Sequence, residues 1–193
     1  MSQLHPAVVV GYDFSHSGEA ALERAVRLAG RAPEHVLHVV CAVDRKHPVP
    51  SIPDGDGVDY LYAARVQEAL AAAVHEALIA ANVTTRVTFF VHARIGKPHE
   101  EILELARQSG ADLIIVGSHG LTGLERVLLG STSEKIVREA RCTVEVARHG
   151  DYPEVELIPL VEVPGTDHTY VPPHRYEYED HRVLLRPADW PLW

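Results

Sequence analysis

The chain has 193 residues, of which 46% are hydrophobic, and carries 18 basic and 27 acidic side chains for a formal charge of −9. This composition excludes general disorder, and no apolar run reaches the roughly 18 residues of a membrane-spanning helix. The negative charge argues against nucleic-acid binding, which needs a basic face. A start without a signal pattern, and two cysteines in apolar segments, favour the reducing cytoplasm.

Strands and helices alternate through the first 150 residues. Short β-branched apolar runs predict buried strands, and apolar residues at helical spacing predict helices between them. In chain order we expect strand 7–11, helix 17–31, strand 35–43, helix 59–81, strand 84–93, helix 98–109, strand 113–116, helix 131–140 and strand 142–147. Ser15 or Ser17 is expected to cap the first helix, and Pro98 suits the first turn of the third.

This alternation predicts an α/β fold with a doubly wound parallel sheet covered by helices on both faces. Such sheets bind ligands beyond the carboxyl ends of their strands, where the strand order reverses. The segments that follow the strands are therefore where a site is expected. They are residues 12–17, 43–57, 94–98 and 117–130.

The segment after the fourth strand is rich in glycine. Gly117 and Gly120 are followed by Gly130 and three hydroxyl residues, Ser131-Thr132-Ser133, which open a predicted helix. Glycine permits close approach of the backbone to a ligand, and free N–H groups at a helix start attract phosphate. A serine-rich helix start is also explained by helix capping alone. The spacing of the glycines over the whole segment has to decide between a phosphate site and a simple cap.

That wider spacing, Gly-2x-Gly-9x-Gly-Ser, resembles the nucleotide-binding signature of the universal stress protein family. Asp13 at the end of the first strand, the Gly96-x-Pro98 pair and the segment from Asp112 to Gly120 agree with the same family. The resemblance covers about three quarters of the chain. It implies a three-layer fold with strand order 3-2-1-4-5 and, because the signature is intact, binding of ATP or of AMP or ADP, with Mg²⁺ as a companion ion.

Carried over residue by residue, the resemblance implies a set of nucleotide contacts at the ends of four elements. The implied residues are Tyr12, Asp13, Ala42, Val43, Val116, Gly117, His119, Gly120, Gly130, Ser131, Thr132 and Ser133. Of the adenine contacts, Val43 or its neighbour Ala42 would act through the backbone. Asp13 has an alternative role as a turn or cap carboxylate of the first helix, and Arg126 is equally suited to phosphate and to solvent.

Several functional classes stay open on these residues. We expect a nucleotide-responsive regulatory or interaction module of the stress response. The alternatives are a slow ATPase or adenylate hydrolase on the same site, and a nucleotide-free interaction protein whose pocket is closed by its own tail. No catalytic constellation stands out, so at most weak hydrolysis is expected. No metal ligands are assigned, because the histidines of the tail match no zinc spacing.

Composition changes sharply near Gly150. Residues 151–193 carry 3 basic and 9 acidic side chains, 7 of the 13 prolines and both tryptophans. We therefore expect a nucleotide-binding domain over residues 1–149 and an acidic C-terminal arm over 150–193. The aromatic residues of this arm predict that it docks, on its own domain or on a second subunit.

The fifth strand departs from the family pattern. Thr143 stands where proline is usual, and Glu145 interrupts the apolar run. We expect a homodimer formed through this strand, through the C-terminal arm, or through both. Glu145 either blunts the strand edge or meets the arm or a basic partner, which leaves the dimer geometry open.

Overall fold

The computed structural model describes residues 5–43, 48–49, 51–53, 57–119, 129–150, 176–179 and 182–185. The chain falls into two compact units, Met1–Gly150 and Asp151–Trp193. In the second unit, β6 (Tyr176–Glu179) and β7 (Arg182–Leu185) pair antiparallel. The extended stretch expected at 155–163 lies outside the described residues. No helix within the described ranges has the length and apolar character needed to cross a membrane.

The first unit alternates strands and helices from end to end. Its elements are β1 (Ala7–Gly11), α1 (His16–Arg31), β2 (Val36–Val43), α2 (Tyr60–Ala80), β3 (Thr88–Ile95), α3 (Pro98–Ser109), β4 (Leu113–Gly117), α4 (Ser131–Glu139) and β5 (Thr143–Ala147). The strands form one parallel sheet in the order β3-β2-β1-β4-β5. The predicted fold class and strand order are confirmed.

The third strand differs most from its prediction. We expected it over 84–93, and it runs from Thr88 to Ile95. Among the described strands its partner is β2, which begins at Val36, and Thr88 is the residue that pairs with Val36. Residues 84–87 therefore have no strand beside them to complete a ladder, whatever their β-propensity.

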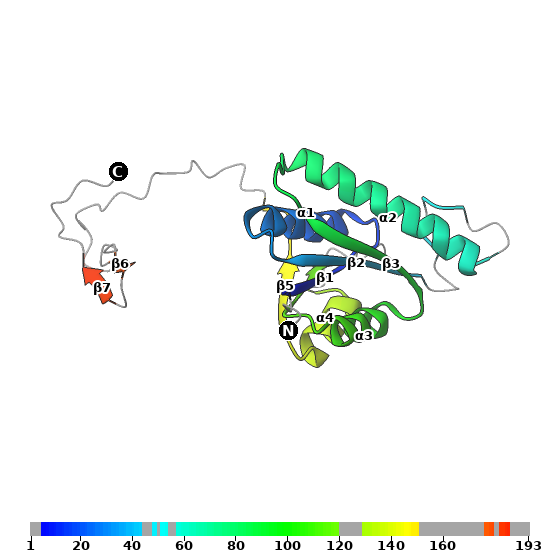
Figure 1. Cartoon of the computed structure of the whole chain (residues 1–193). Helices are drawn as coiled ribbons and strands as arrows, with labels where there is room; N and C mark the ends of the chain where they lie inside the picture. Colours follow the sequence, from blue (N-terminus) through cyan, green and yellow to red (C-terminus); the bar gives the residue numbers. More distant parts are fainter. Residues whose placement is uncertain are drawn as a thin grey trace. The chain divides into compact units, whose positions relative to one another are not determined.

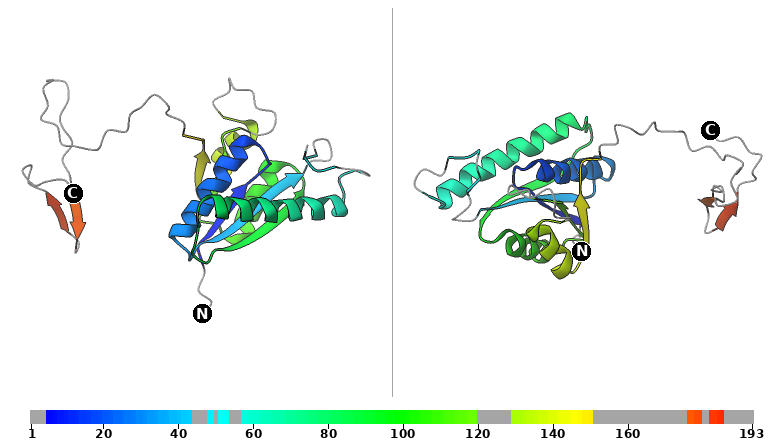
Figure 2. Two further views of the ribbon diagram at one scale, coloured as in Figure 1. Left: turned by 90° about the horizontal axis from the view of Figure 1, so that it is seen from above. Right: turned by 180° about the vertical axis from the view of Figure 1, so that it is seen from behind.

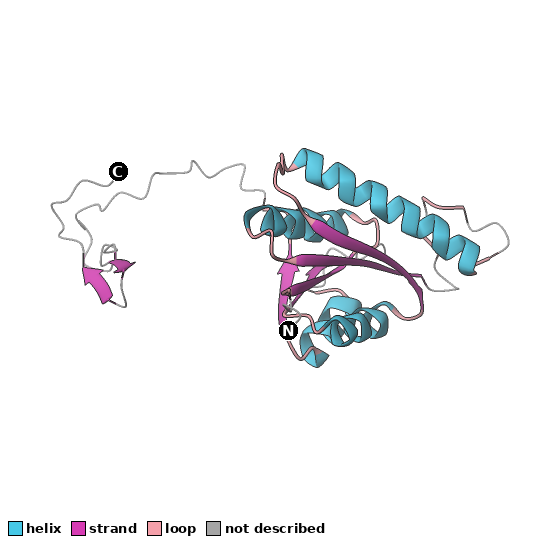
Figure 3. Ribbon diagram, in the orientation of Figure 1, coloured by secondary structure: helices cyan, strands magenta, loops and turns pink. Residues whose placement is uncertain are grey.

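Helices cover both faces of the sheet. Helices α1 and α2 lie on one face and α3 and α4 on the other, which Figure 1 and the rear view of Figure 2 show, and the colouring of Figure 3 makes the three layers plain. Because strand side chains alternate, the central strands contribute residues to two cores, one on each face of the sheet. Val8 and Val10 of β1 belong to the core under α1 and α2, whereas Val9 belongs to the core under α3 and α4.

Local signals fix where the helices begin and end. Ser15, and not Ser17, caps α1, since its side chain accepts a hydrogen bond from the amide of Gly18 at 3.1 Å. Asp59 caps α2 in the same way. Helix α3 begins with Pro98 and ends at Ser109, and its C-cap is Gly110, whose φ of 60° is the left-handed conformation that favours glycine.

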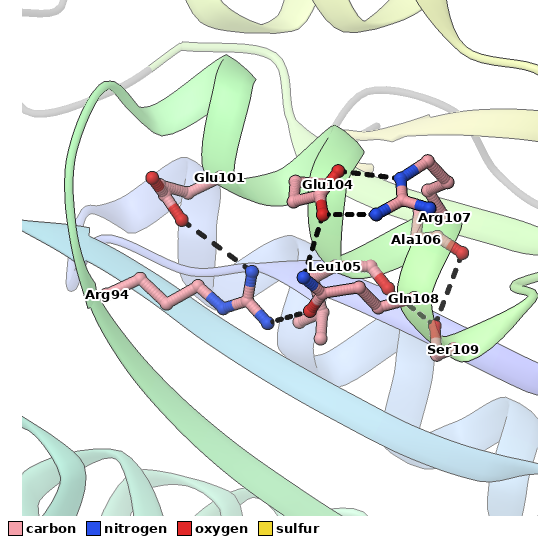
Figure 4. Close-up of polar contacts among 8 residues, drawn as sticks. All are labelled: Arg94, Glu101, Glu104, Leu105, Ala106, Arg107, Gln108 and Ser109. Atoms are coloured by element: carbon pink, nitrogen blue, oxygen red, sulfur yellow. Dashed lines mark hydrogen bonds and ion pairs between the residues drawn. The ribbon is translucent and has the colours of Figure 1, made fainter.

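A polar network fastens α3 to the edge of the sheet (Figure 4). Arg94 of β3 donates to the Gln108 amide oxygen at 2.6 Å and lies 3.6 Å from a Glu101 carboxylate oxygen. Gln108 in turn donates to Glu104 at 2.8 Å, and Arg107 donates to the same carboxylate. Hydrogen bonds from Arg107 and Gln108 lower the pKa of Glu104 to about 2. The network links α3 to β3 at one edge of the sheet.

The chain that leaves β2 is held by a buried tyrosine. Tyr62 of α2 is fully buried, and its hydroxyl oxygen accepts a hydrogen bond from the buried amide of Val49 at 2.7 Å. We predict that Tyr62→Phe lowers the free energy of unfolding by about 1–3 kcal/mol, because the amide of Val49 loses its acceptor. Denaturant unfolding measures the change.

The matched control is Tyr60→Phe, at the first residue of α2. Tyr60 is 89% exposed, so removing its hydroxyl is expected to change the unfolding free energy by no more than about 0.5 kcal/mol. Equal effects of the two substitutions would show that the Tyr62 hydroxyl does not hold this segment.

Candidate functional site

A cavity lies at the carboxyl ends of the central strands, where the strand order reverses between β1 and β4. Six elements, β1, α1, β2, α3, β4 and α4, and residues beside them contribute to its wall. The lining residues are Gly11, Tyr12, Asp13, Gly18, Val40, Ala42, Pro98, Ile102, Val116, Gly117, His119, Gly130, Ser131, Thr132 and Ser133.

Ten of the twelve residues that the sequence nominated lie in this wall. The other two are Gly120 and Val43. Gly120 lies outside the described residues, as does Arg126. Val43 is not among the lining residues: its side chain is fully buried, and its carbonyl oxygen accepts from the amide of Gly96 at 3.1 Å. Of the two alternatives for an adenine contact, only Ala42 borders the cavity.

Five lining residues were not nominated. Gly11, Gly18 and Val40 belong to the strand ends and the first turn of α1, and Pro98 and Ile102 to the first turns of α3. The sequence offered a signal for Pro98, because the segment 94–98 follows a strand on the ligand side of the sheet. Ile102 lies one turn later on the buried side of the same helix and has no signal of its own.

The start of α4 forms one wall of the cavity. Gly130 is its N-cap and contributes no side-chain cap, while the Gly130 amide donates to the Ser118 carbonyl at 2.7 Å. The Ser133 hydroxyl is buried and donates to the Gly117 carbonyl at 2.6 Å. Ser133 therefore ties the helix to β4, and the more accessible hydroxyl residues at this helix start are Ser131 and Thr132.

Asp13 serves the start of α1 from inside the same cavity. One of its carboxylate oxygens accepts from both the amide and the hydroxyl of Ser15, at 3.1 and 2.5 Å. Ser15 is the N-cap of α1, so the carboxylate orients the cap as well as lining the cavity. The turn role weighed for Asp13 from the sequence is thus present in the fold.

Gly117 is required by the packing around it. A Cβ atom at this position would lie 2.4 Å from the backbone oxygen of Ser17 and 2.9 Å from its Cβ. A Cβ on Gly18 would lie 2.7 Å from a carboxylate oxygen of Asp13. Gly117 therefore lets the start of α1 approach the end of β4 closely, and Gly18 lets it lie against Asp13 after the end of β1.

Burial raises the pKa of two groups at or near the cavity, Tyr12 and Cys41. Burial, with smaller effects from Glu19 and Asp13, raises the pKa of Tyr12 to about 12, so its phenol stays protonated at neutral pH. Burial and the charge of Asp13 raise the pKa of the nearby Cys41 thiol to about 12 as well. At neutral pH Cys41 therefore lacks the thiolate that a nucleophile needs. His119 shares a hydrogen bond with the Ser118 hydroxyl at 3.0 Å.

We predict that Gly117→Ala lowers the free energy of unfolding by about 1–3 kcal/mol and loosens the start of α1, because its methyl group meets the Ser17 backbone. Hydrogen exchange should show faster exchange at the first amides of α1. In the control Gly110→Ala no atom lies within 4 Å of the added Cβ, so only the left-handed φ of 60° opposes it. That control is expected to leave α1 exchange unchanged; wild-type exchange in Gly117→Ala would contradict the packing role.

Comparisons with known proteins agree with this architecture. The model of the universal stress protein family matches residues 6–148. A Staphylococcus epidermidis protein named as a universal stress protein is 33% identical over 167 residues, which cover 84% of this chain and 95% of that protein.

Two solved structures share the fold. The universal stress protein UspA from Lactobacillus plantarum superposes with a TM-score of 0.59 at 27% identity, covering 75% of this chain and 98% of its own. A universal stress protein in complex with cAMP superposes with a TM-score of 0.51 at 25% identity, covering 74% of this chain and 96% of its own. By its sequence and by its fold, the chain belongs to the universal stress protein family.

Proposed function

We propose that this protein binds an adenine nucleotide in the cavity between β1 and β4 and acts as a nucleotide-responsive module in stress response. The observation that carries the proposal is the start of α4 at the cavity, capped by Gly130 without a side chain and followed by Ser131 and Thr132. N–H groups at such a helix start favour phosphate. The related structure that holds cAMP lends support to a nucleotide as the ligand class.

The cavity offers a distinct environment to each part of the nucleotide. The phosphates belong at the start of α4, with hydrogen bonds from its first amides and from the hydroxyls of Ser131 and Thr132. The adenine belongs beside Ala42 and Val40 at the end of β2, where the wall is apolar. We further propose ATP as the nucleotide, accompanied by Mg²⁺, since Asp13 lines the same cavity and carboxylate oxygens are the ligands that Mg²⁺ prefers.

The proposed response is a change in interactions rather than rapid turnover. A nucleotide that contacts both α1 and α4 through the cavity would favour one arrangement of these helices over another. A partner that recognises this arrangement would then read the nucleotide state. Both cysteines are free thiols, which accords with the reducing cytoplasm that we propose as the setting.

The central test is calorimetric titration of ATP with Mg²⁺. We predict that Ser131→Ala/Thr132→Ala weakens ATP binding by at least about tenfold, because charge-assisted hydrogen bonds to phosphate are worth roughly 1.5–3 kcal/mol each. Gly130→Val is expected to abolish binding by placing a branched side chain at the uncapped helix start. Circular dichroism checks that both variants stay folded.

The control is Thr84→Ala, which removes an exposed threonine hydroxyl before β3, at the opposite end of the sheet. It should leave the affinity for ATP unchanged. Wild-type affinity in the α4 variants would place the nucleotide elsewhere, whereas a folded wild-type protein that binds no adenine nucleotide would refute the proposal.

We also propose that the protein is a homodimer formed through β5 and the C-terminal arm. Strand β5 lies at one edge of the sheet, and β4 is its partner there among the described strands. Glu145 of β5 is bound by Arg24 of α1 in the same subunit. The carboxylate therefore has a counter-charge of its own, so it does not by itself repel a second strand.

Light scattering on the full chain and on a chain ending at Gly150 tests this assembly. We expect a dimer for the full chain and a weaker dimer, with a concentration-dependent mass, after truncation. If the shortened chain stays a dimer at every concentration and keeps the thermal stability of the full chain, the arm plays no part in the assembly. A monomeric full chain would reject the dimer altogether.

A further inference from the structure

Two histidines and a glutamate come together outside the cavity wall. His16 and Glu19 lie one turn apart at the start of α1, and His149 follows the end of β5 by two residues. The Nδ1 atom of His16 lies 3.6 Å from a carboxylate oxygen of Glu19. The imidazole rings of His16 and His149 stack with centroids 4.0 Å apart. One ligand atom from each of the three side chains lies within 4.8 Å of the others.

One of these distances is close to the separation of two ligand atoms in a zinc coordination shell. Zinc binds nitrogen and oxygen at about 2.0–2.1 Å with tetrahedral geometry, so two of its ligand atoms lie roughly 3.3–3.4 Å apart. The separation of His16 and Glu19 is already near this value. The rings of His16 and His149 are stacked with their planes 24° apart, so binding of one ion requires the imidazoles to turn out of the stack until their in-plane nitrogen lone pairs converge. All three side chains are exposed, which leaves the rings room to turn about their side-chain torsions.

His16 and Glu19 stand on the capped start of α1, and His149 lies two residues beyond the last paired residue of β5. The start of α1 is held by the Ser15 cap and by Asp13, which accepts from Ser15. The residue two before His149, Ala147, pairs with Gly117 of β4. Ligands carried on such anchored elements do not have to be gathered from a flexible loop when a metal binds.

A second contact prepares His149 for coordination. Its Nε2 atom lies 2.9 Å from the carbonyl oxygen of His16. With Nε2 as the donor, this hydrogen bond fixes the neutral tautomer that carries a lone pair on Nδ1. Histidines that bind metals commonly donate their other ring nitrogen to a carbonyl or carboxylate group, which orients the ring.

The donor set selects the class of ion. Two imidazoles and one carboxylate suit Zn²⁺, whereas Mg²⁺ and Ca²⁺ prefer oxygen ligands throughout. We propose that His16, Glu19 and His149 bind one Zn²⁺ ion, with water as the fourth ligand. None of the three residues lines the nucleotide cavity, so this site is independent of the proposed nucleotide function.

The site is tested by letting the full-length protein, first stripped of metal by a chelator, compete for Zn²⁺ with a chromophoric zinc chelator. We expect one tightly bound Zn²⁺ per chain that excess Mg²⁺ does not displace. His149→Ala and Glu19→Gln should each weaken zinc binding by at least about tenfold, because each removes one protein ligand. The control His75→Ala removes an exposed histidine of α2 and should leave the affinity unchanged.

A second control concerns the C-terminal arm, which carries His168, His174 and His181. The triple substitution of these residues by alanine should leave zinc binding intact, and loss of binding in that variant would assign the ion to the arm. Substitution with Co²⁺ adds a spectroscopic reading: visible absorption typical of a low-coordinate site should appear in the wild type and disappear in His149→Ala. Equal zinc affinity in His149→Ala and the wild type, both shown to be folded, would overturn the proposal.

Discussion

The arrangement of the candidate site depends on the backbone of one residue, Gly117, at the end of β4. The absence of a side chain there lets the Ser17 carbonyl of α1 approach to a distance that no Cβ would tolerate. The Gly117 carbonyl accepts the buried hydroxyl of Ser133 and so holds the start of α4. Gly117 also pairs with Ala147 at the end of β5. Two helix starts and two strand ends thus meet at one residue.

This convergence explains why chemically useful groups gather at one edge of the sheet. Parallel strands bring their carboxyl ends together, and each helix of a βαβ unit on this side begins close to the strand before it. Helix α1 is capped by Ser15, which Asp13 orients, whereas α4 begins at Gly130 with no side-chain cap. The start of α4, unlike that of α1, is therefore open to an external anion that supplies what a side-chain cap would otherwise provide.

The fold was predictable because local patterns and global architecture agree. Buried β-branched runs, helical spacing and the placement of Ser15 and Pro98 all indicated the same alternation of strands and helices, and the structure has it. The predicted start of the third strand was wrong, because the length of a strand is set by its partner strand. Thr88 is the residue that faces Val36, and no property of residues 84–87 reveals this.

The site was predictable in part. Ten of the twelve nominated residues line one cavity, because the topology of a parallel sheet brings its strand ends together. Single-residue roles were harder, since they depend on distances between elements. The packing demand on Gly117 needs the position of Ser17, and the buried position of Val43 needs the pairing of β2 with β3. Residues as far apart in the chain as His16 and His149 carry no shared signal in the sequence at all.

The most direct test of adenine-nucleotide binding uses the protein as cells supply it. The full-length chain is purified without added nucleotide, denatured, and the released small molecules are identified by mass spectrometry, with Gly130→Val prepared in parallel. Binding in the cavity predicts an adenine nucleotide released by the wild-type protein and none by the variant. An equal amount of nucleotide from both folded proteins, or none from the wild type together with no heat on titration with ATP and Mg²⁺, would contradict it.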